Sequence, residues 1–182
     1  MLHIVYGGSA SGKSSYAESF AMSLQGEGRL LYIATMYPYK WNTTEIDPET
    51  MQRIERHRAM RADKGFDTVE CYRHVEHIVA KRQDVLLLEC MSNLLANEMY
   101  LEPDSNAGSD MAETMSPVSN KIVQALIDLS TRVQELVIVT NDVFSDGGSL
   151  TYDESTREYV KNLAEINCAL AREAATVTEV VC

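Results

Sequence analysis

Short apolar segments alternate with amphipathic segments along the whole chain. Apolar runs of five to eight residues that end at glycine or at a charged residue are typical of strands buried on both faces, as in a parallel sheet. The clearest example is the run "DVLLLEC", which stays apolar until it reaches Glu89. The pattern predicts strands at residues 2–6, 29–35, 67–72, 84–90, 135–142 and 176–182.

Between these runs, apolar residues recur every three or four positions, which indicates helices with one buried face. In residues 13–24, Tyr16, Phe20 and Leu24 share a face with two alanines. The pairs Asp47-Pro48 and Ser116-Pro117 have the residues that begin helices. We expect helices at 13–24, at 92–101 and through 159–170. Two more helices should begin at 48 and at 117, and a short one after the 67–72 strand should end near Arg82. Residues 102–116 should form a polar loop.

Alternation of strands and helices predicts an α/β fold, with a mainly parallel sheet that carries helices on both faces. The segment 7–14, "GGSASGKS", adds a phosphate loop to this fold, because it reads G-x-x-x-x-G-K-[ST] between a strand and a helix. Its backbone N–H groups can curl around phosphate oxygens. Lys13 can reach the β- and γ-phosphates, and Ser14 can ligate Mg²⁺.

A magnesium site beside such a loop needs a carboxylate at the end of a neighbouring strand. Glu89, which closes its apolar run, is the candidate, and Asp142 at the end of the 135–142 run is a less specific second one. The segment around Asp142 reads "VTND" and not N-K-x-D, which disfavours a small GTPase.

Bulk composition restricts the class of protein. The chain has 182 residues, expected to form one domain over 1–182, and a net charge of −11, which argues against general nucleic-acid binding. Its four cysteines show no C-x-x-C spacing, so we expect reduced thiols in a cytoplasmic protein rather than a zinc site. No apolar run approaches the ~20 residues of a membrane span, and the first residues do not resemble a signal peptide.

One segment departs from this acidic character. "MQRIERHRAMR", residues 51–61, places His57 among four arginines on a predicted helix whose buried side carries Met51 and Ile54. Arg53 and Arg61, four residues to either side, flank the imidazole. Like charges at this spacing repel, and an anion between them would remove the repulsion. The alternative is a solvated basic helix with a bystander histidine.

If this helix faces the phosphate loop, the arginines could bind a triphosphate while His57 attacks its α-phosphorus. Nucleotidyl-histidine would form and pyrophosphate would leave. The loop and the helix would then belong to one active site.

The ordered set "GGSASGKSSYAE", "YIAT", "RIERHR", "TVE", "LLLEC" and "VTNDV" resembles the bifunctional adenosylcobinamide kinase/adenosylcobinamide-phosphate guanylyltransferase family of cobalamin assembly. The resemblance spans nearly the whole chain, and it implies that the P-loop fold is RecA-like. It implies ATP or GTP as phosphate donor, GTP as guanylyl donor, a corrinoid acceptor, Mg²⁺, and a homotrimer with sites between subunits.

The resemblance also implies residue roles. His57 would carry the guanylyl group, and Lys13 would serve the phosphate-transfer chemistry. The nucleotide-binding residues would be Gly7, Gly8, Ser9, Ala10, Ser11, Gly12, Lys13, Ser14, Ala34, Thr35, Met36, Arg58, Ala59, Met60, Arg61, Glu70 and Glu89, with Ser14 and Glu89 at the metal.

Two segments differ from the family pattern. Asp142 stands where the family usually has Glu, and the residues that follow it, "VFSDGGSLTYDES", replace a short Gly-Ile-Val-Pro-like segment. The end "EVVC" also lacks the usual glycine and basic tail. These differences leave two alternatives open: an enzyme with only one of the activities, and a non-enzymatic nucleotide-binding module.

Overall fold

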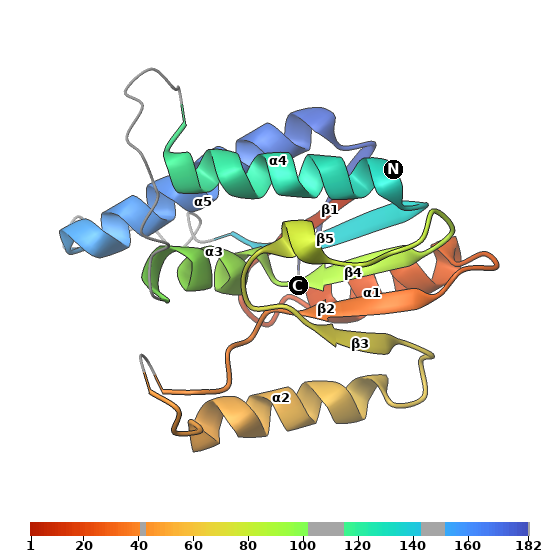
Figure 1. Ribbon diagram of the computed structural model, residues 1–182, viewed down its shortest axis with the longest axis horizontal. Helices are drawn as coiled ribbons and strands as arrows, with labels where there is room; N and C mark the ends of the chain where they lie inside the picture. Colours follow the sequence, from red (N-terminus) through yellow and green to blue (C-terminus); the bar gives the residue numbers. More distant parts are fainter. Residues whose placement is uncertain (41–42, 102–114, 143–151, 182) are drawn as a thin grey trace.

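The computed structural model describes residues 1–40, 43–101, 115–142 and 152–181. Its six strands all run parallel in one sheet of order β3-β2-β4-β5-β1-β6 (Figure 1), which confirms the predicted parallel α/β fold. The strands are β1 (Leu2–Gly7), β2 (Leu30–Ala34), β3 (Asp67–Glu70), β4 (Val85–Glu89), β5 (Glu135–Asn141) and β6 (Thr176–Glu179).

Helices cover both faces of this sheet, as predicted. Helix α1 (Lys13–Leu24) packs Ala17 and Ala21 against one face, in a cluster with side chains of β1, β2, β4 and β5. Helices α3 (Met91–Tyr100), α4 (Pro117–Arg132) and α5 (Glu154–Glu173) cover the other face in a larger apolar cluster. Among the described residues, no helix combines the length and the apolar character needed to cross a lipid bilayer.

The helix starts predicted from Asp-Pro and Ser-Pro pairs are confirmed. Asp47 Oδ2 accepts a hydrogen bond of 3.1 Å from the backbone N–H of Thr50, and Pro48 is the first residue of α2 (Pro48–Arg61). Ser116 caps α4 in the same way, through the N–H of Ser119. A side-chain oxygen at this position satisfies one of the N–H groups that the first helical turn leaves unpaired.

Three details of the prediction are wrong. The segment before Arg82 forms only a single 3-10 turn, η1 (Val75–His77), because His74 has a left-handed backbone with φ 57° and Ile78 is already extended. In α1, the alanines face the core, while Tyr16 is 42% exposed and stacks on Phe20. In α2, Met51 and Ile54 are only half-buried, and the one buried residue is Arg61.

The position of α2 explains its poor burial. It lies beyond β3, apart from the helices that cover the sheet faces (Figure 1). The loop expected at 102–116 falls mostly outside the described residues, as do residues 143–151 of the segment that departs from the family pattern, and Cys182. Cys71, Cys90 and Cys168 are free thiols, as expected.

The amino end of the sheet is tied by one buried carboxylate. Asp84, which precedes β4 and is 1% exposed, accepts hydrogen bonds from the backbone N–H of Arg29 at 3.0 Å and of Lys81 at 2.8 Å. It also pairs with the Arg29 guanidinium. Burial disfavours the charged carboxylate, but these bonds outweigh it, and the pKa of Asp84 is lowered.

We expect Asp84→Asn to lower the free energy of unfolding by about 1–3 kcal/mol at neutral pH, since it removes a charged acceptor and leaves the Arg29 guanidinium without its partner. The folded-state pKa of Asp84 lies below its ordinary value, so this stabilisation is present above the ordinary pKa and is lost as the pH falls. Urea unfolding of wild type and variant at several pH values should show the two curves converging in acid. A constant difference down to strongly acidic pH would contradict this account.

Candidate active site

Five strand ends meet at the carboxyl edge of the sheet. Gly7 at the end of β1 pairs with Asn141 of β5, and Ala34 of β2 pairs with both Glu70 of β3 and Glu89 of β4. Ligand sites of open parallel sheets lie at this edge, because the loops that follow the strands converge there. The predicted phosphate loop and the predicted acidic partner are therefore brought to one place.

The phosphate loop has the backbone that its glycines predict. Gly12, which caps α1, has φ 84°, a conformation that few residues with a side chain adopt. A Cβ on Gly7 would lie 2.4 Å from the carbonyl oxygen of Val180, so a side chain does not fit there. Lys13 is 9% exposed, and its Nζ donates to the Gly8 carbonyl at 2.9 Å, which holds it across the loop.

Ser14 and Glu89 are in direct contact, as a shared metal site would require. The Ser14 hydroxyl donates to Oε1 of Glu89, and Oε2 is buried with no hydrogen-bond partner among the described residues. Burial raises the pKa of Glu89, and the bond from Ser14 opposes that shift. A buried oxygen left unpaired is costly, and a divalent cation would satisfy it. The residues therefore fit a magnesium ion.

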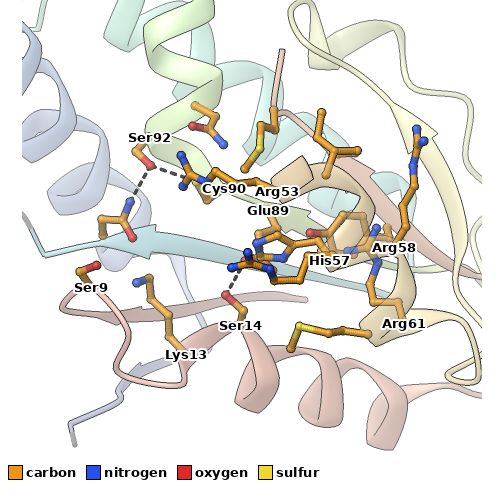
Figure 2. A pocket seen from close by; sticks show the side chains of 18 of the residues that line it. Ser9, Lys13, Ser14, Arg53, His57, Arg58, Arg61, Glu89, Cys90 and Ser92 are labelled. Atoms are coloured by element: carbon orange, nitrogen blue, oxygen red, sulfur yellow. Dashed lines mark hydrogen bonds between the residues drawn. The ribbon is translucent and has the colours of Figure 1, made fainter. Parts of the chain in front are cut away.

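Helix α2 forms the opposite wall of the same site. A cleft of about 720 Å³ is lined by Lys13 and Ser14 from the loop and by His57, Arg58 and Arg61 from α2. Figure 2 shows His57 and the arginines gathered across this space from the loop residues. The condition set by the sequence, that the basic helix should face the phosphate loop, is met.

Arg61 is held in an unusual way. Its guanidinium carbon lies 3.4 Å from the centre of the Tyr32 ring, and the residue is only 5% exposed. Within the described part of the chain, its Nε and one terminal nitrogen have no hydrogen-bond partner. Stacking on an aromatic face stabilises a cation, but it leaves the N–H groups unsatisfied. An anion in the cleft would satisfy them.

The surroundings of His57 lower the pKa of its imidazole. Half-burial is the largest cause that lowers the pKa of its imidazole, and the positive charges of Arg61, Arg53 and Arg56 lower it further. The carboxylate of Glu18 opposes this effect. The neutral form carries the free electron pair of a nucleophile, so the arginine cluster favours reactive histidine at neutral pH.

Most of the predicted site residues line the cleft. Gly7, Gly8, Ser11 and Gly12 instead build the backbone of the loop, while Thr35 and Ala59 lie outside the lining. The predicted residues that line it are Ser9, Ala10, Lys13, Ser14, Ala34, Met36, His57, Arg58, Met60, Arg61, Glu70 and Glu89.

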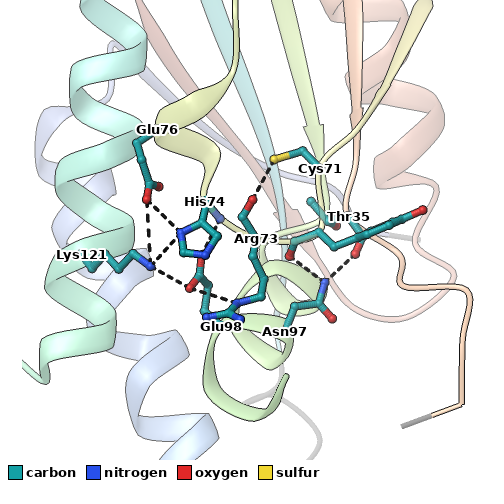
Figure 3. A network of polar contacts seen from close by, with 9 residues as sticks. Thr35, Cys71, Arg73, His74, Glu76, Asn97, Glu98 and Lys121 are labelled. Carbon is teal, nitrogen blue, oxygen red and sulfur yellow. Dashed lines mark hydrogen bonds and ion pairs between the residues drawn. The ribbon is translucent and has the colours of Figure 1, made fainter. Parts of the chain in front are cut away.

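Thr35 supports the cleft from behind. Fully buried, it donates to the Cys90 carbonyl at 2.9 Å and accepts from the Cys90 N–H at 2.8 Å. Asn97 of α3 donates to the carbonyls of Thr35 and Tyr72 at 2.8 and 2.9 Å (Figure 3). These bonds fix the loops after β2, β3 and β4 to one another.

Sequence reasoning did not select several lining residues. Tyr32 precedes Ala34 by two positions in β2 and so shares its face, a signal that the alternation of strand side chains could have supplied. Asn141 donates to the Ser92 hydroxyl at 2.7 Å, which joins the end of β5 to the start of α3. The residues not selected are Tyr32, Tyr72, Cys90, Ser92, Asn93 and Asn141.

Comparison with known proteins agrees with this arrangement. Two curated relatives, each called bifunctional adenosylcobalamin biosynthesis protein CobU, come from Escherichia coli K12 and Salmonella typhimurium LT2. Each is 30% identical to this chain, and each alignment covers all of the chain and 96% of the relative. The model of the cobinamide kinase / cobinamide phosphate guanyltransferase family matches residues 3–182, and the chain therefore belongs to this family of kinases and nucleotidyltransferases.

Proposed function

We propose that this enzyme phosphorylates adenosylcobinamide and then transfers GMP from GTP to the new phosphate, through a guanylyl group carried on His57. The observation that carries the proposal is the single cleft that holds both the phosphate loop and His57. Family membership and the two bifunctional relatives support the pair of activities and the nucleotide and corrinoid substrates.

In the kinase step, the loop holds the triphosphate by its backbone N–H groups and Lys13. The hydroxyl oxygen of the corrinoid's aminopropanol arm bonds to the γ-phosphorus, the bond from that phosphorus to the bridging oxygen breaks, and the nucleoside diphosphate leaves. The hydroxyl proton is released. A magnesium ion between Ser14 and Glu89 would neutralise charge on the phosphate oxygens.

In the guanylyl step, a ring nitrogen of His57 bonds to the α-phosphorus of GTP, and pyrophosphate leaves. A phosphate oxygen of the phosphorylated corrinoid then bonds to this phosphorus, and the P–N bond breaks. The products are adenosylcobinamide-GDP and free imidazole. Arg61, with unpaired buried N–H groups, and Arg53 stabilise the developing charge.

The alternative is an enzyme with only one of the two activities. It is based on the segment after Asp142, which departs from the family pattern and lies partly outside the described residues. The trimer also stays a proposal. An exposed apolar residue beside α2 supports it, since Ile46, just before the helix, is 51% exposed.

Lys13→Ala should reduce both activities by roughly 10²-fold or more, because one lysine is proposed to contact the triphosphate in both steps. Rates of γ-phosphate transfer and of pyrophosphate release should be measured separately at saturating GTP. Wild-type kinase turnover in this variant would disprove a shared loop.

Glu89→Gln should weaken magnesium-dependent turnover more than it weakens nucleotide binding. Glutamine keeps the shape of Glu89 but removes the charge from the buried oxygen that has no partner. Magnesium titrations of activity, alongside binding of a fluorescent GTP analogue, test this. Superimposed titrations would exclude Glu89 from the metal site and leave Asp142 as the candidate.

His57→Ala should lose protein labelling from α-labelled GTP, while the wild type takes this label and none from γ-labelled GTP. The bond should be a phosphoramidate, labile in acid and fairly stable in base. The variant should keep much of its kinase activity, since γ-transfer requires no histidine nucleophile.

Arg58→Ala serves as the comparison for this experiment. Arg58 is 45% exposed at its side chain and pairs with Glu70, so its loss should slow labelling without abolishing it. Full labelling of His57→Ala would mean that another residue is the nucleophile. In that case α2 would be a solvated basic helix with a bystander histidine.

A further inference from the structure

Three side-chain contacts connect the C-terminal half of α2 and the turn after it to the rest of the described structure. Arg58 pairs with Glu70 of β3, Arg61 stacks on Tyr32 of β2, and Lys64 pairs with Glu18 of α1. They differ in what surrounds them. The first is half-exposed on both sides, and exposed ion pairs contribute little to stability.

The second contact cannot hold α2 rigidly by itself. Arg61 keeps unpaired N–H groups that a bound phosphate would engage, so its position depends on the ligand. The third contact has neither weakness. Glu18 has a side chain only 3% exposed, and its Oε2 lies 2.5 Å from Nζ of Lys64, which is itself 29% exposed. Neither solvent nor nucleotide competes strongly for this pair.

The locations of Glu18 and Lys64 connect two helices of the site. Glu18 lies one helical turn after Ser14 on α1, the helix whose first turn forms the end of the phosphate loop. Lys64 lies seven residues after His57, in the turn that follows α2. The pair therefore relates the helix that carries the histidine to the helix that carries the phosphate-binding groups.

We propose that Glu18 and Lys64 form a positioning pair that holds the end of α2 over the phosphate loop, so that His57 faces the α-phosphorus of the bound nucleotide. This inference rests on the function proposed above and adds two residues to it. Neither residue lines the cleft, so the pair acts through the placement of α2 and not by contact with the nucleotide.

The pair also affects the charge around His57. The imidazole is surrounded by Arg53, Arg56 and Arg61 on its own helix, and Glu18 is the carboxylate that faces it from α1. Glu18→Gln therefore changes the protonation of His57 as well as its position. Lys64→Met keeps Glu18 and the aliphatic length of the side chain, and it removes the contact between Glu18 and the turn after α2.

The test compares two rates in the same full-length protein. For Lys64→Met we expect the first-order rate of labelling from α-labelled GTP to fall roughly 10- to 100-fold, the cost of a small displacement of a reacting group. Affinity for a fluorescent GTP analogue and the rate of γ-transfer should change by less than about threefold, because the loop is intact. Lys64→Arg should restore labelling, because arginine can pair with Glu18.

The double variant Glu18→Gln/Lys64→Met guards against misfolding, since it leaves no unpaired buried charge. Residues that act as one unit are not additive, so the double variant should label no more slowly than Lys64→Met. Asp84→Asn is the matched control, because it removes the charge of a buried carboxylate that pairs with Arg29 at the far end of the sheet. It should lower stability and leave the ratio of the two rates unchanged.

Equal losses in labelling and γ-transfer, or unchanged labelling in the double variant, would overturn the positioning role. Hydrogen exchange of α2 without nucleotide separates this result from a failure of the proposed function. Lys64→Met should exchange faster than wild type in residues 55–65, and slow exchange there would reject the anchor. A wild type that takes no label, with fast exchange in the variant, would reject the guanylyl-histidine alone.

Discussion

The parallel direction of all six strands is the constraint on which the site depends. It places the ends of β1, β2, β4 and β5 at one edge, so that Gly7 lies beside Asn141 and Ala34 lies beside Glu89. Ser14 and Glu89, which are 75 positions apart in the chain, thus lie together in one cleft. The network around Thr35 and Asn97 then fixes the loops that leave these strand ends.

A cluster of positive charge in an acidic chain needs compensation, and α2 receives it in three ways. Near solvent, Glu70 forms an ion pair with Arg58. The Tyr32 ring stacks on Arg61. In the turn after the helix, Lys64 forms an ion pair with buried Glu18. None of these partners satisfies all the N–H groups of Arg61. Arg61 therefore keeps hydrogen-bond donors for an anion, and burial together with the arginine charges lowers the pKa of His57.

Strands and phosphate loop could be predicted from the sequence because their signals are local. Apolar runs define the central strands, and two glycines of residues 7–14 are required by the backbone: Gly7 has no room for a Cβ, and Gly12 has a positive φ. The buried face of α2 could not be predicted in this way. Apolar periodicity selected Met51 and Ile54, whereas the buried residue is Arg61, because the helix packs on an aromatic ring and a carboxylate rather than on the apolar core. Lys64 and Glu18, 46 positions apart, carry no pairwise signal in a single sequence.

The two proposed transfers need access to different phosphorus atoms of the bound triphosphate. The kinase step needs the γ-phosphorus, and the guanylyl step needs the α-phosphorus. In the proposed function, Lys13 and Ser14 at the start of α1 would hold the outer phosphates, while His57 lies on α2 at the other wall. The corrinoid hydroxyl would have to approach the γ-phosphorus, and the cleft wall on the side away from α2 includes Ser92 and Asn141. The α-phosphorus then lies toward α2. One mode of binding would in this way present two phosphorus atoms to two nucleophiles, and the position of α2 would decide whether the second reaction occurs.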